Sequence, residues 1–301
     1  MTTVVALGGN ALTRRGERGT TADQLANLRV ACAHLAPLLG EERVVVTHGN
    51  GPQVGNELLR QERAADEAPP LPLWLAVAQT QAAIGALIEG ELRPVAGRPV
   101  ACLVTHVRVD PDDPAFARPT KPIGPFYDEA RAAALERERG WTLRDEPGRG
   151  WRRVVPSPEP LEVVELETIQ ALLDAGTIAV ACGGGGVPVV RRDDRLKGVD
   201  AVIDKDRASA LLGAALAATR LVLLTDVAAV YRDFRGSDER ELRELDVAAA
   251  ERLLAELDEG SMRPKVEAAA RFVRGGGSEA LITSFEELER ALAGEAGTLL
   301  R

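Results

Sequence analysis

The sequence predicts an α/β fold, a doubly wound layer in which helices cover both faces of a mostly parallel sheet. Four short runs are apolar throughout instead of alternating, which is typical of strands that are buried on both sides. Helical patterns lie between these runs, so strand, turn and helix repeat along the chain. The four expected strands are residues 3–7, 43–47, 178–182 and 221–225.

Glycine-rich turns follow three of the four expected strands. The carboxyl ends of parallel strands share one edge of the sheet, and ligands of open α/β sheets bind at that edge. Glycine lets backbone N–H groups approach an anion, and the helix that follows adds a favourable dipole. Together the turns therefore predict a phosphate site. They are Gly8-Gly9-Asn10, His48-Gly49-Asn50-Gly51-Pro52 and the four glycines at 183–186.

The helices are predicted from their positions between strands and from their terminal residues. We expect helices at residues 23–39, 53–66 and 206–217. A later helix opens at Ser261, with Pro264 in its first turn, and closes at the three glycines 275–277. Ser284 followed by Glu287 is a capping box for the last helix.

One segment departs from the repeating pattern. Residues 110–160 contain nine of the 18 prolines and two of the three tryptophans. A plain connection between strand and helix takes ~2–6 residues, so this segment is too long to be one. A simple surface excursion is one interpretation, and we favour a lid or protruding subdomain over the site.

The composition and the missing motifs exclude several functions. Lys and Arg total 37 against 46 Asp and Glu, a net charge of −9, which disfavours nucleic acids and anionic membranes as partners. The sequence has no P-loop, no GxSxG elbow and no HExxH motif. Its GxGxx[GA] spacing, at 275–280, follows a predicted helix, so we do not expect an NAD enzyme.

The cysteines and the hydropathy pattern indicate a cytoplasmic protein. No apolar run approaches the ~18–20 residues of a membrane span. The cysteines are far apart and form no CxxC pair, which is typical of a reducing compartment. The histidines show no metal-ligand spacing, and we interpret them as surface or core imidazoles. These residues are Cys32, Cys102 and Cys182, and His34, His48 and His106.

Lysine is rare in this chain, and its positions are informative. Lys205 and Lys265 stand at expected helix starts, where an ammonium group opposes the helix dipole at a cost of a few tenths of a kcal/mol. Contact with phosphoryl oxygens would explain these positions, because phosphoryl transfer relies on positioning and charge neutralisation. Lys121 lies in the proline-rich segment, whereas Lys197 is interpreted as an ordinary surface lysine.

Acidic and aromatic residues near these lysines are further candidates. Asp206 follows Lys205, where it orients the lysines or a metal-bound water, or only favours the helix N-terminus. Asp226 and Tyr231 follow the fourth expected strand and are candidates for nucleotide contact. For Tyr231, ordinary packing is an almost equally good interpretation.

The ordered set of motifs resembles the carbamate kinase family, within the amino acid kinase superfamily. Each motif alone is weak, but the set runs in order over nearly the whole chain and is highly specific. The segments are ALGGNAL (6–12), THGNGPQVGN (47–56), VDPDDPAF (109–116), PTKPIGPFY (119–127), RRVVPSP (152–158), CGGGGVPV (182–189), KGVDAVIDKDRAS (197–209), LTDVAAVY (224–231) and GSMRPKVEAA (260–269).

The resemblance implies a fold and a reaction. The fold is a three-layer αβα sandwich around a mostly parallel sheet, with a protruding lid subdomain at about 110–160. It forms one domain over 1–301, with a carbamoyl phosphate side at 1–175 and a nucleotide side at 176–301. The implied reaction is reversible phosphoryl transfer between carbamoyl phosphate and ADP with Mg²⁺, in a homodimer.

The resemblance also assigns roles to individual residues. The nucleotide phosphates are expected to carry Mg²⁺, without direct ligation by side chains. The catalytic residues would be Lys121, Lys205, Asp206 and Lys265; the substrate-binding residues Gly8, Gly9, Asn10, Gly49, Asn50 and Gly51; and the nucleotide-binding residues Lys205, Asp226, Tyr231, Met262 and Lys265.

Two departures bear on the choice within the superfamily. Ala6 stands where many superfamily members have a lysine, which favours carbamate kinases over acetylglutamate or aspartate kinases. Arg263 replaces an expected small or apolar residue, and contact with the nucleotide and exposure to solvent both stay open for it. The alternative function is a kinase of another small acyl phosphate or of an amino-acid carboxylate, with Arg14 and Arg15 available to bind a carboxylate. A ligand sensor without activity is less favoured.

Overall fold

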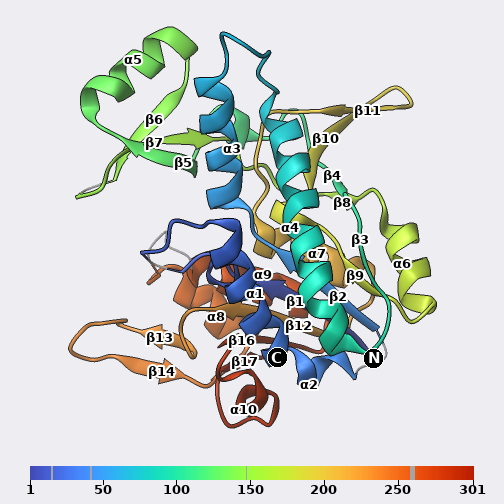
Figure 1. Ribbon diagram of the computed structural model, residues 1–301. Coiled ribbons are helices and arrows are strands. Elements are labelled where there is room, and N and C mark those ends of the chain that lie inside the picture. Colours follow the sequence, from blue (N-terminus) through green and yellow to red (C-terminus); the bar gives the residue numbers. More distant parts are fainter. Residues whose placement is uncertain (15, 41–42, 147, 258–261) are drawn as a thin grey trace.

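An eight-stranded sheet forms the centre of the molecule in the computed structural model (Figure 1). The structure describes residues 1–14, 16–40, 43–146, 148–257 and 262–301. The strand order is β15-β17-β16-β12-β1-β2-β9-β3, and every pair is parallel except β16 with β17. The strands are β1 (Thr2–Leu7), β2 (Arg43–His48), β3 (Val100–Cys102), β9 (Ile178–Val180), β12 (Arg220–Thr225), β15 (Glu244–Leu245), β16 (Glu279–Ser284) and β17 (Thr298–Leu300).

The four strands expected from the sequence are the four adjacent strands β12, β1, β2 and β9, so the prediction of a buried, mostly parallel sheet is confirmed. Three of them match their expected bounds to within a residue at each end. β9 ends at Val180, two residues earlier than expected. One cause is Cys182, whose φ of 50° is incompatible with an extended strand.

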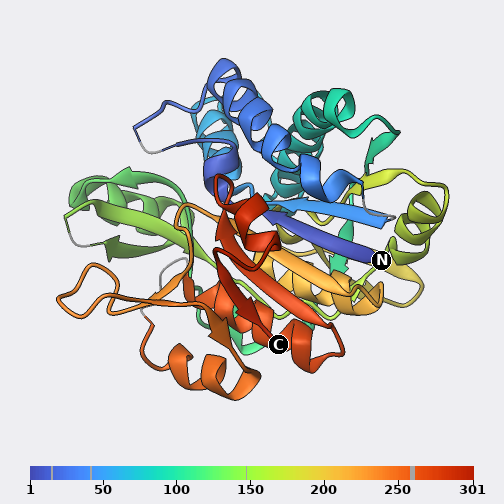
Figure 2. The same ribbon diagram turned by 90° about the horizontal axis from the view of Figure 1, so that it is seen from below.

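Helices cover both faces of the sheet, which confirms the three-layer arrangement (Figure 2). Within β1, Val4 and Ala6 belong to the core on one face, and Val5 and Leu7 to the core on the other. Helices α1, α2, α4 and α10 contribute to the core with Val5, and helices α6, α7, α8 and α9 to the core with Val4. Their bounds are α1 (Thr21–His34), α2 (Ala36–Leu39), α4 (Leu73–Ala96), α6 (Leu166–Asp174), α7 (Lys205–Ala215), α8 (Val247–Leu254), α9 (Met262–Arg274) and α10 (Leu288–Leu292).

The helix ends differ from the predicted ones for local reasons. Thr20 and Asp23 form a capping box, so α1 begins at Thr21, two residues earlier than expected. The expected helix 23–39 is interrupted at Leu35, and α2 continues as a separate turn. Asp204 caps α7, which therefore begins at Lys205 and not at Asp206.

The later helix termini are confirmed in part. Helix α9 ends before the three glycines as predicted, and the Gly277 amide donates to the Phe272 carbonyl. The expected opening residue Ser261 lies outside the described residues. The last helix begins at Leu288, and of its predicted capping box the structure retains the bond from the Glu287 amide to the Ser284 hydroxyl, at 3.3 Å.

A small subdomain projects from the main body beside helix α3 (Gly51–Arg63), expected at 53–66 (Figure 1). It contains the antiparallel strands β5 (Lys121–Tyr127), β6 (Thr142–Glu146) and β7 (Gly150–Val155), and the helix α5 (Glu129–Arg139). The protrusion expected at about 110–160 is therefore confirmed over a narrower span. Gly55 of α3 meets Gly124 of β5 so closely that a Cβ on Gly55 would lie 2.4 Å from the Gly124 Cα.

The remaining strands form two smaller sheets. One contains β4 (His106–Arg108), β8 (Glu162–Val163), β10 (Val187–Arg192) and β11 (Arg195–Gly198), and the other is the hairpin of β13 (Val230–Arg232) and β14 (Arg240–Leu242). Short 3-10 turns lie at Gly9–Ala11, Pro114–Phe116 and Gly183–Gly185. Over the described ranges, every helix is too short or too polar to cross a membrane.

Candidate active site

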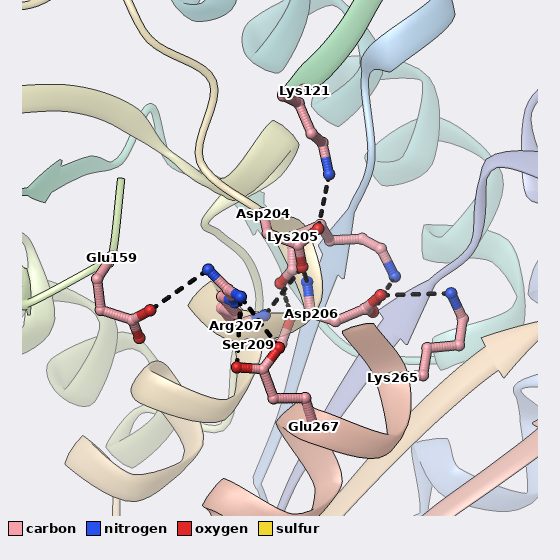
Figure 3. Close-up of polar contacts among 9 residues, drawn as sticks. All are labelled: Lys121, Glu159, Asp204, Lys205, Asp206, Arg207, Ser209, Lys265 and Glu267. Carbon is pink, nitrogen blue, oxygen red and sulfur yellow. Dashed lines mark hydrogen bonds and ion pairs between the residues drawn. The ribbon is translucent and has the colours of Figure 1, made fainter. Parts of the chain in front are cut away.

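The first turn of α7 carries the carboxylates that organise the site. Asp204 Oδ1 accepts hydrogen bonds from the backbone amides of Asp206 and Arg207, at 2.9 and 3.2 Å, and so caps the helix. Asp204 Oδ2 accepts a bond of 2.6 Å from Lys121 Nζ. Lys121 is the first residue of β5, so this ion pair joins the subdomain to the start of α7 (Figure 3).

Asp206 lies between two lysines from different helices (Figure 3). Lys205 Nζ lies 2.5 Å from Asp206 Oδ1, and Lys265 Nζ of α9 lies 3.3 Å from Asp206 Oδ2. Only 4% of Asp206 and 6% of Lys265 are exposed. We name Lys121, Asp204, Lys205, Asp206 and Lys265 the lysine cluster. The structure thus brings together all four residues that the sequence predicted to be catalytic.

The charges in the cluster alter the pKa values of its members. Burial alone would raise the pKa of Asp206, but the Lys205 and Lys265 ammonium groups hold it below its usual range. Burial lowers the pKa of Lys205, and nearby Lys265 acts in the same direction, although Asp206 opposes them. With its groups in their usual charge states, the cluster carries three positive and two negative charges, and the excess favours an anion.

The glycine turn after β2 lies beside this cluster, and the turn after β1 packs against β12. A Cβ on Gly49 would lie 3.8 Å from Lys205 Cδ, so the lysine stem passes directly over the turn after β2. The Thr47 and Ser209 hydroxyls lie 2.7 Å apart and join β2 to α7. A Cβ on Gly8 would lie 2.6 Å from the carbonyl oxygen of Leu224 in β12, so only glycine fits at the end of β1.

The glycines at 183–186 pack against the turn after β2 and against the segment that leads into α7. A Cβ on Gly184 would lie 2.3 Å from Asn50 Nδ2, and one on Gly185 would lie 2.4 Å from the Ile203 carbonyl oxygen. The buried Asn50 side chain donates a bond of 3.0 Å to Thr80 Oγ1 of α4. The three predicted turns therefore do converge on one edge of the sheet.

The other predicted substrate residues occupy the same turns. Gly9 is exposed and opens the 3-10 turn after β1. Asn10 follows it there, and only its backbone is described. Gly51 begins α3, where the Val54 amide donates to the Asn50 carbonyl.

The residues predicted to bind nucleotide are more dispersed. Asp226 is exposed just after β12 and accepts a 3.1 Å bond from Thr225 Oγ1. Tyr231 is half-buried on β13 and packs against the ring of Phe234 at 5.6 Å. Met262 is half-buried at the start of α9 and packs against the core.

Two further basic residues lie away from the cluster contacts. Lys197 lies exposed on β11 and makes none of the cluster contacts, as expected for a surface lysine. Arg263 is exposed on α9. Of the two interpretations of Arg263, contact with the nucleotide and exposure to solvent, its position agrees with the second.

Sequence reasoning gave no role at the site to His48 or Gln81. His48 Nδ1 lies 3.0 Å from the Gly49 carbonyl oxygen, which can only accept, so this nitrogen carries the proton. Burial lowers the pKa of His48 to about 4, and nearby Lys205 acts in the same direction. Gln81 of α4 donates to the Gly183 carbonyl at 3.0 Å. His48 lies within the glycine turn at 47–52, so its place at the site could have been inferred from the sequence. No motif in the sequence includes Gln81.

Two observations limit what else the site can be. Over the described residues, no group of three or more His, Cys, Asp or Glu side chains is arranged to hold a metal ion. A groove of about 670 Å³ opens between α1, α3 and α4, lined by residues such as Gln24, Asn56 and Thr80. No member of the lysine cluster lines this groove. The groove is therefore separate from the lysine cluster.

Comparison with known proteins places the chain in a family. The family model for the amino acid kinase family matches residues 1–284, and the chain therefore belongs to the amino acid kinase family. Within that family it is similar to carbamate kinases. It is 48% identical to the carbamate kinase of Halobacterium salinarum and 44% identical to that of Thermococcus kodakarensis, each over 98% of this chain and 97% of the relative.

Solved structures agree with the sequence relatives. The carbamate kinase from Giardia lamblia bound to AMP-PNP has a TM-score of 0.92 and 39% sequence identity, covering 99% of this chain and 98% of that one. Among the sequence relatives, a carbamate kinase-like protein of Escherichia coli is 43% identical, over 99% of this chain and 98% of its own length. The resemblance expected from the motifs is thus confirmed.

Proposed function

We infer that this chain is a carbamate kinase, which transfers a phosphoryl group reversibly between carbamoyl phosphate and ADP to give ATP and carbamate. One observation carries the inference: two ammonium groups from two helices are buried around Asp206, beside glycine turns at the carboxyl edge of the sheet. The carbamate kinases among the relatives support the choice of substrate.

The chemistry needs charge neutralisation more than proton transfer. A β-phosphate oxygen of ADP attacks the phosphorus of carbamoyl phosphate, and the bond from phosphorus to the carbamate oxygen breaks. Carbamate leaves as an anion, so no general acid is required. Lys205 and Lys265 neutralise the oxygens of the transferring group, and Asp206 holds both ammonium groups in place.

The two substrates approach the lysine cluster from opposite sides. Carbamoyl phosphate is bound on the side of residues 1–175, by backbone N–H groups of the turns at 8–10 and 49–51. Lys121 also binds it, after the Lys121 ammonium group has left Asp204. The nucleotide is bound on the side of residues 176–301, by Asp226, Tyr231 and Met262. Residues 121–155 act as the lid.

Mg²⁺ bound with the nucleotide would supply further neutralisation of the phosphate charges. The residues fit a metal that the phosphates carry, because the nearby carboxylates already have cationic partners. Both oxygens of Asp206 contact lysines, and Asp204 is bound to Lys121 and to two backbone amides. We further propose that the protein is a cytoplasmic homodimer.

A panel of phosphoryl donors distinguishes this function from the alternative one, a kinase of another acyl phosphate or of an amino-acid carboxylate. With ADP and Mg²⁺, carbamoyl phosphate should yield ATP far faster than acetyl phosphate does. In the reverse direction, glutamate, aspartate and N-acetylglutamate should give no ADP above the rate with ATP alone. A preference for any of these other substrates would reject the carbamate kinase assignment, and nucleotide binding without turnover would indicate a sensor.

A further inference from the structure

A second group of charged residues joins helices α7 and α9 beside the lysine cluster. Arg207 Nη2 donates to both carboxylate oxygens of Glu267, at 3.0 and 3.3 Å (Figure 3). Arg207 Nη1 lies 3.4 Å from Glu159. Arg271 also pairs with Glu159, and it lies 2.8 Å from Glu267. We name these four residues the outer quartet.

Two members of the outer quartet lie on the same helices as members of the lysine cluster and close to them in sequence. Arg207 directly follows Asp206 on α7, and Glu267 lies two residues after Lys265 on α9. Each helical residue is rotated by about 100° from its neighbour, so these side chains point to different sides. Helices α7 and α9 are therefore joined twice, by Asp206 with Lys265 and by Arg207 with Glu267.

Glu159 extends this link to the segment that returns from the subdomain. It lies between β7 and β8, where its amide donates to Asp113 Oδ2 at 2.9 Å. In the same segment, the Pro156 carbonyl accepts a 3.0 Å bond from the Val202 amide, just before α7. Arg207 thus contacts both α9, which carries Lys265, and the segment between β7 and β8, which follows the subdomain.

We propose that Arg207 is a positioning residue, which binds Glu267 and Glu159 and thereby holds Lys205 and Lys265 at the spacing that phosphoryl transfer requires. The proposal rests on the function inferred above. A displacement of about 1 Å at a reacting centre reduces rates by up to about 10²-fold. The Arg207 and Glu267 side chains keep 29% and 21% of their surface exposed, so solvent screens this ion pair in part. Loss of the pair should therefore reduce kcat, while the variant still folds.

Steady-state kinetics of variants test the proposal. In Arg207→Gln and in Glu267→Gln we expect kcat to fall about 10-fold, with KM for ADP and carbamoyl phosphate within about 2-fold of wild type. The double variant should lose no more than either single variant, because both remove the same link. Arg207→Lys keeps the charge and should recover most of kcat.

A matched control is the ion pair of Arg220 with Glu279, 2.6 Å apart and 21% and 27% exposed. It joins β12 to β16 at the start of both strands, away from the carboxyl edge. Arg220→Gln should leave kcat and KM unchanged. An Arg207→Gln kcat equal to that of wild type, or a drop matched by the control, would overturn the proposal. Losses that multiply in the double variant would also overturn it.

A crystal structure of Arg207→Gln tests the positioning role without any assay. The distance from Lys265 Nζ to Asp206 Oδ2, 3.3 Å in the wild type, should increase, and an unchanged distance would overturn the proposal. The two inferences can fail separately. A wild-type protein that forms no ATP rejects the proposed function, and the variant structure then still decides whether Arg207 positions the lysines.

Discussion

At the scale of single residues, the buried lysines of the cluster and the exposed Lys197 should contribute differently to catalysis. Lys205→Ala and Lys265→Ala each remove a buried ammonium group beside Asp206, and each should reduce kcat by ~10²–10³. Lys197→Ala removes an exposed lysine on β11 and should leave kcat near that of wild type. The rate of ATP formation from carbamoyl phosphate gives kcat for all three variants. An equal loss of kcat in all three would refute this ranking.

His48 should make stability depend on pH in the acid range. Its pKa is lowered from 6.5 to about 4 in the folded chain, so the unfolded chain binds more protons between these values. The contribution of His48 is therefore complete above pH 6.5 and falls as the pH decreases toward 4, by about 3 kcal/mol in total. Urea unfolding at pH 7 and pH 4.5 measures it.

The control for this prediction is His48→Gln, which removes the titrating group. Its free energy of unfolding should fall less than that of wild type over the same pH interval. If the two proteins lose stability in parallel as the pH decreases, His48 is not the group responsible.

Some of the site residues could be predicted from the sequence and others could not. The lysines were identifiable because lysine is rare here and because two of them stand at helix starts. The contact between Lys121 and Asp204 joins residues 83 positions apart, and no local pattern encodes it. Arg207 was not identifiable either, since it is one of many arginines and its importance depends on how α7 meets α9.

At the scale of elements, the contact between α3 and β5 should tolerate little change. A Cβ on Gly55 would lie 2.4 Å from the Gly124 Cα, so Gly55→Ala must force the two backbones apart. We expect a loss of about 1–3 kcal/mol in the free energy of unfolding. The control is Gly90→Ala, because Gly90 is exposed on α4 with open space around its Cα.

Gly90→Ala should instead stabilise the protein by about 0.5–1 kcal/mol, since alanine is favoured over glycine within a helix. Urea unfolding of both variants measures the difference. Two variants with the same stability would show that the close approach of Gly55 and Gly124 is not restrictive.

Helix α4 and strand β5 are among the elements that were not predicted from the sequence, for physical reasons. Helix α4 spans 24 residues, but Pro72 at its N-cap gives no side-chain hydrogen bond, so the N-terminal capping signal is absent, and Pro94 lies inside the helix, where proline usually indicates a break. Strand β5 contains Pro122 and Pro125, which disfavour a strand assignment. It accommodates them as an edge strand with an irregularity between Ile123 and Phe126. The uniformly apolar strands, in contrast, were predictable because both of their faces are buried.

At the scale of the whole molecule, an acidic chain carries a buried cluster with a local excess of positive charge. The net charge is −9, yet the lysine cluster has more positive than negative groups. Such a local excess is compatible with an acidic surface because the cluster is buried and weakly screened by solvent. The sheet positions this cluster, since its glycine turns and the starts of α7 and α9 meet at one edge.

We expect that the lysine cluster, and not the groove between α1, α3 and α4, binds the transferring phosphoryl group. A crystal structure with Mg²⁺ and a non-hydrolysable ATP analogue tests it most directly. Terminal phosphate oxygens should lie about 3 Å from the Nζ atoms of Lys205 and Lys265. Phosphates bound instead in the groove between α1, α3 and α4, without contact to Lys205, would contradict this expectation.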